Sequence, residues 1–190
     1  MTNQIAFQGA LGAYSDEACR SARPTMDPLP CQNFEEMIEA VREGQADLAM
    51  VPVENSTYGR VADIHRLLPE SGLHIVDEAF TRVRISLMAN PGTELEDVKT
   101  IRAHLVLLPQ ARNFLDQTGI EPISAADSAG AAAELAKSPN PHSGVLASAI
   151  AAEIYGLNIL AQNIEDQGHN TTRFLIMSRE PNHARRGDGK

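Results

Sequence analysis

The sequence predicts an α/β protein built from two lobes with a ligand cleft between them. Short strand-forming runs alternate with helical patterns along the whole chain, as in proteins built from strand–helix–strand units. Residues 73–90 form a segment too long for one average strand of about five or six residues. A strand that leaves one sheet and enters another explains this length. We expect one lobe over residues 1–80 and 166–180, a second over 81–165, and a polar tail or linker over 181–190.

The first half of the chain should fold as strands at "IAF" (5–7), "LPC" (29–31) and "LAMVPV" (48–53), each followed by a helix. The first helix is expected after Ser15, because the acidic residues that follow suit the positive end of a helix. Asn33 stands three residues before Glu36, which is the spacing of a capping box, and Gly44 is a natural stop. A third helix is expected from about Val61.

The second half repeats the alternation. After the long segment, the expected strands are "AHLVL" (103–107), "EPIS" (121–124), "GVLAS" (144–148) and "LNILAQNI" (157–164). Helices are expected near 109–118, after an N-cap at Asp127 or Ser128, and up to Tyr155. The run "TTRFLIMS" (171–178) should return to the first sheet. These elements predict mostly parallel sheets with helices on both faces.

Composition restricts the possible partners. Hydrophobic residues make up 43% of the 190 residues and charged residues 22%, which indicates a folded globular protein. The formal net charge of −9 disfavours binding to nucleic acid phosphates. We expect no membrane partner and a cytoplasmic location, because there is no apolar run of about 18 residues and no cationic start before an apolar core. Cys19 and Cys31 have no metal-ligand spacing and are expected to be plain thiols.

Three polar loops follow expected strands, where open α/β sheets bind ligands. They are "QGALGAYS" (8–15), "ENSTYGR" (54–60) and "EDQGHNTTR" (165–173). The first leads into a helix whose free N–H groups could meet an anion. The second could equally be an ordinary capped turn.

In the third loop, Gly168 and Asn170 would suffice for a turn, so the Thr-Thr-Arg that follows must tie the loop down or hold something polar. Arg173 needs a ligand or an acid such as Glu54 nearby. His104 alone is typical of a packed histidine on an apolar strand.

Six segments together resemble the prephenate dehydratase family, in its order and approximate spacing. They are "FQGALGAYSDEA", "VPVENSTYGRV", "AHLVLLPQAR", "DSAGAAAELA", "LASAIAAEIYGLNIL" and "NTTRFLIM". The resemblance runs from about residue 5 to residue 178. It implies a pair of α/β lobes similar to type II periplasmic ligand-binding proteins, and conversion of prephenate to phenylpyruvate without a cofactor or metal.

The resemblance also implies site residues. Thr172 matches the proposed hydrogen-bond donor of the family. The substrate-binding positions implied by the other motifs are Gly12, Tyr14, Ser15, Glu54, Asn55, Ser56, His104, Gln110, Ser128, Arg173 and Phe174. Two family hydroxyls are replaced, one at Ala103 and one in the loop around Ala13.

The resemblance leaves three further points as expectations. The regulatory domain that binds phenylalanine in this family, the ACT domain, is not found in these 190 residues. A homodimer is expected, with the Ala-rich segments 129–136 or 147–152 either forming its face or lying in the core. The alternatives to a prephenate dehydratase are an arogenate dehydratase and a non-catalytic small-molecule-binding protein of the same architecture.

Overall fold

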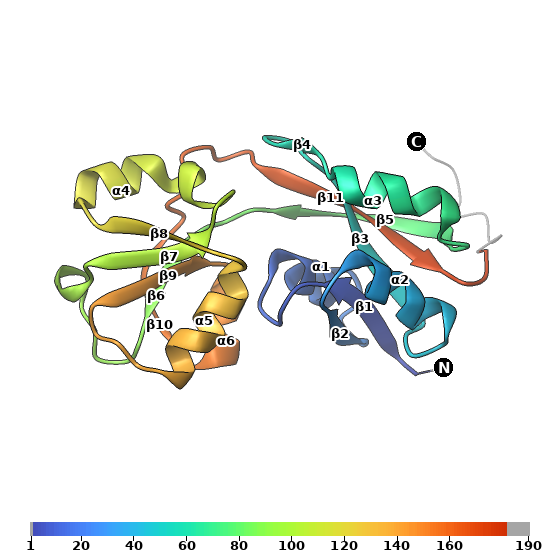
Figure 1. Cartoon of the computed structure of the whole chain (residues 1–190), viewed down its shortest axis with the longest axis horizontal. Coiled ribbons are helices and arrows are strands. Elements are labelled where there is room, and N and C mark those ends of the chain that lie inside the picture. Colours follow the sequence, from blue (N-terminus) through green and yellow to red (C-terminus); the bar gives the residue numbers. More distant parts are fainter. Residues whose placement is uncertain (1, 182–190) are drawn as a thin grey trace.

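The computed structural model describes residues 2–181, so the expected tail at 181–190 lies outside the described residues apart from Pro181. The chain forms two sheets, each in its own lobe (Figure 1). This confirms the expected two-lobed α/β fold with a cleft. Among the described residues, no helix has the length and apolarity needed to cross a membrane.

The first lobe contains a sheet with the strand order β2-β1-β3-β11-β5, and β4 pairs with β3. Its elements are β1 (Gln4–Gln8), α1 (Tyr14–Ala22), β2 (Asp27–Cys31), α2 (Phe34–Arg42), β3 (Leu48–Asn55), β4 (Gly59–Arg60), α3 (Ala62–Leu67), η1 (Leu68–Glu70), β5 (His74–Arg82) and β11 (Thr171–Ser178).

The second lobe contains a sheet with the order β10-β6-β9-β7-β8. Its elements are β6 (Ser86–Ala89), η2 (Leu95–Asp97), β7 (Thr100–His104), η3 (Leu108–Ala111), α4 (Arg112–Thr118), β8 (Glu121–Ala125), α5 (Ser128–Lys137), β9 (Ser143–Ala147), α6 (Ala149–Tyr155) and β10 (Asn158–Gln162).

The sheets are mixed, so the expectation of mostly parallel sheets was wrong. β1 pairs with β2 and β3 in parallel, and β7 pairs with β8 and β9 in parallel. The strand that follows each crossover runs the other way: β11 is antiparallel to β3 and β5, and β6 is antiparallel to β9 and β10. A chain that leaves one lobe and later returns enters each sheet from the opposite end, which reverses those strands.

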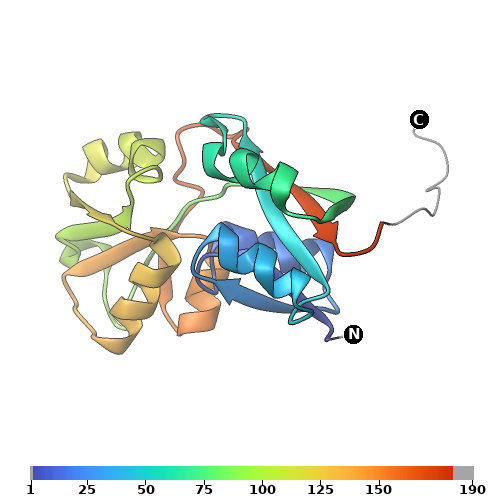
Figure 2. The same ribbon diagram turned by 45° about the vertical axis from the view of Figure 1, so that its right-hand side comes forward.

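Two segments cross between the lobes, as the length of residues 73–90 predicted. β5 and β6 belong to different sheets and are separated by residues 83–85, and the connection from β10 to β11 makes the return. Both segments bridge the lobes in the turned view as well (Figure 2). They touch each other, because the Val83 N–H donates to the Asn170 carbonyl at 2.9 Å.

Helices cover both faces of each sheet, as expected. In the first lobe, α2 and α3 pack on one apolar cluster and α1 packs on another that contains Phe7 and Phe174. In the second lobe, α5 and α6 pack on one cluster and α4 on the other. The Ala-rich segments supply buried residues of the α5 and α6 cluster, including Ala131, Ala132, Ala151 and Ala152. These four alanines therefore lie in the core, which is one of the two roles expected for the Ala-rich segments.

Caps decide where the helices begin. Asn33 Oδ1 accepts from the Glu36 N–H at 2.8 Å, and Asp127 caps α5. α1 differs from the expectation, because it begins at Tyr14 with Ala13 at the N-cap position and no side-chain cap. β7 also ends earlier than expected, at His104. The open first turn of α1 and the end of β7 both reach the space between the lobes.

Candidate functional site

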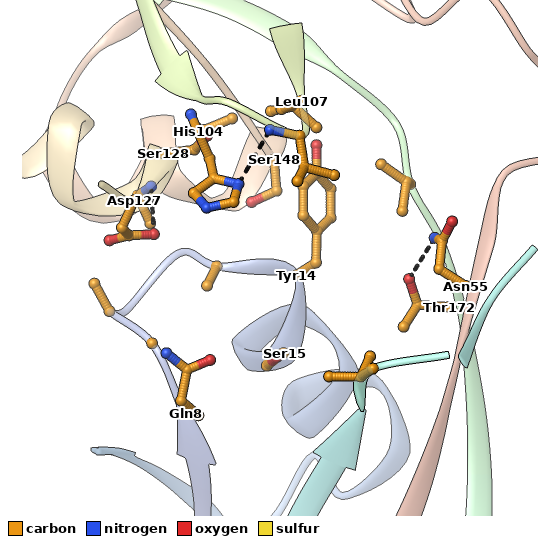
Figure 3. Close-up of a pocket in the computed structure, with 18 of the residues that line it drawn as sticks. Gln8, Tyr14, Ser15, Asn55, His104, Leu107, Asp127, Ser128, Ser148 and Thr172 are labelled. Carbon is orange, nitrogen blue, oxygen red and sulfur yellow. Dashed lines mark hydrogen bonds between the residues drawn. The ribbon is translucent and has the colours of Figure 1, made fainter. Parts of the chain in front are cut away.

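A cleft of about 800 Å³ lies between the lobes. Its walls come from the carboxyl ends of strands in both sheets and from the first turns of α1 and α5 (Figure 3). Eight of the residues expected at the site line it: Gly12, Tyr14, Ser15, Asn55, His104, Gln110, Ser128 and Thr172. Residues far apart in the sequence therefore meet at the carboxyl ends of strands, the position expected for a ligand site.

Four expected residues lie outside the cleft lining: Glu54, Ser56, Arg173 and Phe174. The alternation of side chains along a strand explains Arg173 on β11, since adjacent Thr172 and Arg173 point to opposite faces. Arg173 Nη2 lies 2.9 Å from Glu78 Oε2 on β5. The expected ion pair of Arg173 with Glu54 is absent, although the two are cross-strand neighbours. Phe174 is 1% exposed and belongs to the core.

Ser56 holds two loops together. Its hydroxyl oxygen accepts from the Thr171 N–H at 2.9 Å, and its own N–H donates to the Thr171 carbonyl at 2.9 Å. The loop after β3 is thereby fixed against the start of β11. Ser56 positions the site without lining it, and Glu54 is exposed on the face away from Asn55.

Asn55 and Thr172 face each other on neighbouring strands. The Asn55 Nδ2 group donates to Thr172 Oγ1 at 3.0 Å (Figure 3). It also donates to Asn170 Oδ1 at 2.7 Å. The Asn55 Oδ1 atom accepts from the N–H groups of Thr57 and Tyr58 at 2.9 and 3.0 Å. Both amide hydrogens and both acceptor sites of Asn55 are therefore used within the protein.

The orientation of the Thr172 hydroxyl follows from this pair. Its oxygen already accepts a hydrogen bond from Asn55, so its own hydrogen is free to donate elsewhere. Thr172 lines the cleft. A ligand acceptor in the cleft would therefore receive this hydrogen bond.

His104 and Ser128 stand on the opposite wall of the cleft (Figure 3). The His104 backbone N–H donates to Ser128 Oγ at 2.9 Å, and the Val106 N–H donates to His104 Nδ1 at 3.3 Å. Nδ1 acts as an acceptor, so the neutral ring carries its hydrogen on Nε2. Both the Ser128 hydroxyl and this ring N–H remain able to donate.

The loop before α1 touches the second lobe. The Ser148 hydroxyl donates to the Gly12 carbonyl at 2.6 Å, and the Tyr155 hydroxyl donates to the Leu11 carbonyl at 2.7 Å. Gly12 has a φ of +86°, and a Cβ built there would lie 2.8 Å from the Cα of Ala151. Glycine is required at this position by both its backbone conformation and the close approach of α6.

Comparison with known proteins places the chain in a family. The family model described as prephenate dehydratase matches residues 5–182. The chain belongs to the prephenate dehydratase family. It is 51% identical over 177 residues to a bifunctional N-acyl-homoserine lactone acylase/prephenate dehydratase from Komagataeibacter europaeus, covering 93% of this chain and 63% of that protein. It is 41% identical over 178 residues to arogenate dehydratase 2 from Petunia hybrida, covering 94% of this chain and 45% of that protein.

Two solved structures are similar to this member of the family. GqqA, described as a quorum-quenching acylase, has a TM-score of 0.89 at 50% identity, covering 94% of this chain and 65% of that one. Prephenate dehydratase from Arthrobacter aurescens, in complex with L-Phe, has a TM-score of 0.85 at 31% identity, covering 93% of this chain and 60% of that one. The chain spans less than two thirds of the length of each of these relatives.

The charges in the cleft of this prephenate dehydratase family member are sparse. Of the described residues that line it, Arg60 alone carries an Arg or Lys side chain, and it has no ion-pair partner within residues 2–181. Burial raises the pKa of the Tyr14 hydroxyl, which donates to the Arg84 carbonyl at 3.0 Å. Burial also raises the pKa of the Cys31 thiol to about 11. Across residues 2–181, no three His, Cys, Asp or Glu side chains gather in a way that could hold a metal ion.

Sequence reasoning missed several polar residues at or beside the cleft: Gln8, Arg60, Asn170 and Ser148. Asn170 closes the expected turn, since its N–H donates to the Gln167 carbonyl at 3.5 Å, but it does so without a positive φ. Its side-chain amide, whose role the sequence did not indicate, is hydrogen-bonded to the amide of Asn55. Ser148 follows β9 directly, and its place at the carboxyl end of a strand was the signal that could have indicated it.

Proposed function

We propose that the chain catalyses the decarboxylating dehydration of prephenate to phenylpyruvate, a step of phenylalanine biosynthesis. The observation that carries this proposal is the orientation of the Thr172 hydroxyl, which accepts from Asn55 and is left to donate into the cleft. Membership of the prephenate dehydratase family supports it.

The main requirement of the reaction is a hydrogen-bond donor at the leaving hydroxyl group of the substrate. The bond from the ring to its carboxylate breaks and releases carbon dioxide, and the electron pair of that bond enters the ring. The C–O bond breaks in concert, and the departing hydroxide takes one proton to become water. Aromatisation drives the reaction, so a hydrogen bond that strengthens as charge develops on the leaving oxygen lowers the barrier. Thr172 provides this bond or relays the proton, which ultimately comes from solvent.

The substrate carries two carboxylates, and the cleft offers two places for them. The first turn of α1 has no side-chain cap, and Tyr14 and Ser15 of this turn line the cleft. Free N–H groups at a helix N-terminus bind anions. Arg60 supplies a guanidinium, which pairs with carboxylates. The loop that leads into α1 was itself expected to meet an anion, and Arg60 takes the role that the sequence suggested for Arg173.

A second candidate is hydrolysis of N-acyl-homoserine lactones, favoured by the bifunctional name of a relative that is 51% identical. The geometry supports it less. Among residues 2–181, no serine, threonine or cysteine side chain is hydrogen-bonded to a histidine ring, so an activated nucleophile of that type is not in place. Arogenate dehydration keeps the chemistry proposed above and changes only the side chain of the substrate.

The test is to supply the purified chain with prephenate, arogenate and an N-acyl-homoserine lactone in separate assays. Phenylpyruvate is followed by its ultraviolet absorbance, phenylalanine and homoserine lactone by chromatography. We expect turnover of prephenate that is lost in Thr172→Val. Turnover of arogenate alone would move the assignment to arogenate dehydratase. Binding of prephenate without product, measured by calorimetry, would leave a binding protein.

A further inference from the structure

Asn170 is a buried amide between the lobes, with 2% of its surface exposed. Its Oδ1 atom accepts from Asn55 Nδ2 at 2.7 Å, and its Nδ2 group donates to Gln110 Oε1. Asn55 ends β3 of the first lobe, whereas Gln110 lies in η3 of the second. The side chain of Asn170 therefore connects a cleft residue of one lobe to a cleft residue of the other.

Backbone groups fix the direction of this chain of amides at both ends. The N–H groups of Thr57 and Tyr58 bind Asn55 Oδ1, so Asn55 must present its N–H groups to Thr172 and Asn170. At the other end, Gln110 Nε2 donates to the Val106 carbonyl at 2.8 Å, so Gln110 must present its oxygen to Asn170. A flip of any one amide would place two donors or two acceptors against each other.

Asn170 also lies where the lobes are joined. Its carbonyl accepts from the Val83 N–H at 2.9 Å, and these two residues belong to the two segments that cross between the sheets. A change in the relative position of the lobes would move Gln110 relative to Asn55. The Asn170 amide is the link that would transmit this change to the pair of Asn55 and Thr172.

We infer that Asn170 is a positioning residue, which holds the Asn55 amide so that the Thr172 hydroxyl donates into the cleft and which makes this orientation depend on Gln110 of the second lobe. The inference rests on the proposed function, because Thr172 is its endpoint. It requires Asn170 to accept on one side and donate on the other at the same time.

Asn170→Asp tests this requirement, because the new side chain has the same shape and a titratable donor. The ionised carboxylate still accepts from Asn55 but faces the oxygen of Gln110 without a hydrogen, whereas the protonated acid donates to that oxygen again. Burial favours the neutral form, so protonation should begin well above the usual pKa of aspartate. We expect kcat of the variant relative to wild type to be about tenfold lower at pH 8 and to recover as the pH falls to 6.

Two controls separate this effect from a general loss of structure. Asn158→Asp makes the same chemical change at an exposed residue outside the cleft and should follow the wild-type pH profile. In a Gln110→Ala background, the acid recovery of Asn170→Asp should vanish, because its acceptor is gone. Circular dichroism at each pH checks that every variant is folded. The rate of spontaneous aromatisation of prephenate, measured without enzyme, is subtracted.

The outcomes distinguish the two proposals. Suppose that wild type turns over prephenate but kcat of Asn170→Asp does not recover at pH 6, or recovers equally in the Gln110→Ala background. Either result would overturn the role of Asn170 and leave the dehydratase proposal standing. If wild type binds prephenate without product, the dehydratase proposal fails. In that case the role of Asn170 is tested on the dissociation constant of prephenate, measured by calorimetry for wild type and Asn170→Asp at pH 8 and pH 6. Absence of both binding and turnover would overturn both.

Discussion

The amide of Asn55 donates to the hydroxyl oxygen of Thr172 across 3.0 Å, between β3 and β11. This bond determines the direction of the hydroxyl, because an oxygen that accepts from Asn55 leaves its own hydrogen to the cleft. Asn55 has no hydrogen-bonding capacity left for a ligand. It therefore acts on Thr172, whereas the family resemblance alone suggested a direct contact with substrate.

Removal of the Thr172 hydroxyl should lower kcat about 10²- to 10³-fold with little change in KM, because the hydrogen bond strengthens only as the C–O bond breaks. Thr172→Val keeps the shape of the side chain, and phenylpyruvate formation provides the measurement. Thr171→Val is the matched control, since this neighbouring hydroxyl lies outside the cleft lining. Activity of Thr172→Val within about threefold of wild type would remove the hydroxyl from the mechanism.

Asn55→Asp should lower kcat about 10²-fold while KM changes little. The new carboxylate still caps the N–H groups of Thr57 and Tyr58, but it offers Thr172 an acceptor and draws the hydroxyl hydrogen away from the cleft. The double variant Asn55→Asp/Thr172→Val should be no slower than Thr172→Val, since both changes remove one donor. A rise in KM at unchanged kcat would instead show that Asn55 contacts the substrate.

Arg60→Gln should raise KM about tenfold and leave kcat nearly unchanged, because a guanidinium–carboxylate bond at the rim of the cleft holds ground state and transition state alike. The effect should weaken at high salt. Arg66→Gln serves as the control, as this exposed arginine pairs with Glu35 away from the cleft. Equal effects of both substitutions would point to net charge rather than to a bound carboxylate.

Gly12→Ala should destabilise the fold by more than its backbone conformation alone explains. Gly12 and Gly92 share a φ of +86°, but only at Gly12 would a Cβ meet a neighbour, the Cα of Ala151 at 2.8 Å. The loss in free energy of unfolding caused by Gly92→Ala therefore measures the conformational cost alone. The additional loss in Gly12→Ala, about 1–3 kcal/mol, measures the steric overlap with the second lobe. Urea unfolding measures both. Equal losses of unfolding free energy in the two variants would mean that the lobes move apart to accommodate the new methyl group without cost.

Cys31 should react slowly with iodoacetamide at neutral pH although it lines the cleft. Burial, helped by the charge of Glu36, raises its pKa from 9.0 to about 11. The reactive thiolate is the deprotonated form, so at pH 8 its fraction is about a hundredfold below that of an ordinary thiol, and it rises tenfold per pH unit up to the shifted pKa. Mass spectrometry of labelling from pH 7 to 10, with a cysteine peptide as reference, checks this. Labelling at the rate of the peptide would contradict the prediction.

The two-lobed architecture could be predicted from the amino-acid sequence alone. The length of residues 73–90 exceeds one strand, and capping residues such as Asn33 and Asp127 mark helix starts by local hydrogen bonds that need no distant partner. The motifs around Asn55 and Thr172 likewise indicated the family and the position of the cleft, because the carboxyl ends of strands bind ligands in any open α/β sheet.

Which polar side chains reach the cleft could not be predicted from the sequence, because it depends on how the strands pair and how the lobes meet. Arg173 and Thr172 are adjacent in sequence, yet strand pairing turns one toward Glu78 and the other toward Asn55. The register of β11 against β3 also shifts between Arg173 and Phe174, which no local pattern reveals. Asn170 closes a local turn, but the acceptor of its side-chain amide is supplied by Gln110, 60 positions away. The direction of a side chain depends on register and on distant partners, and these exist only once both lobes have formed.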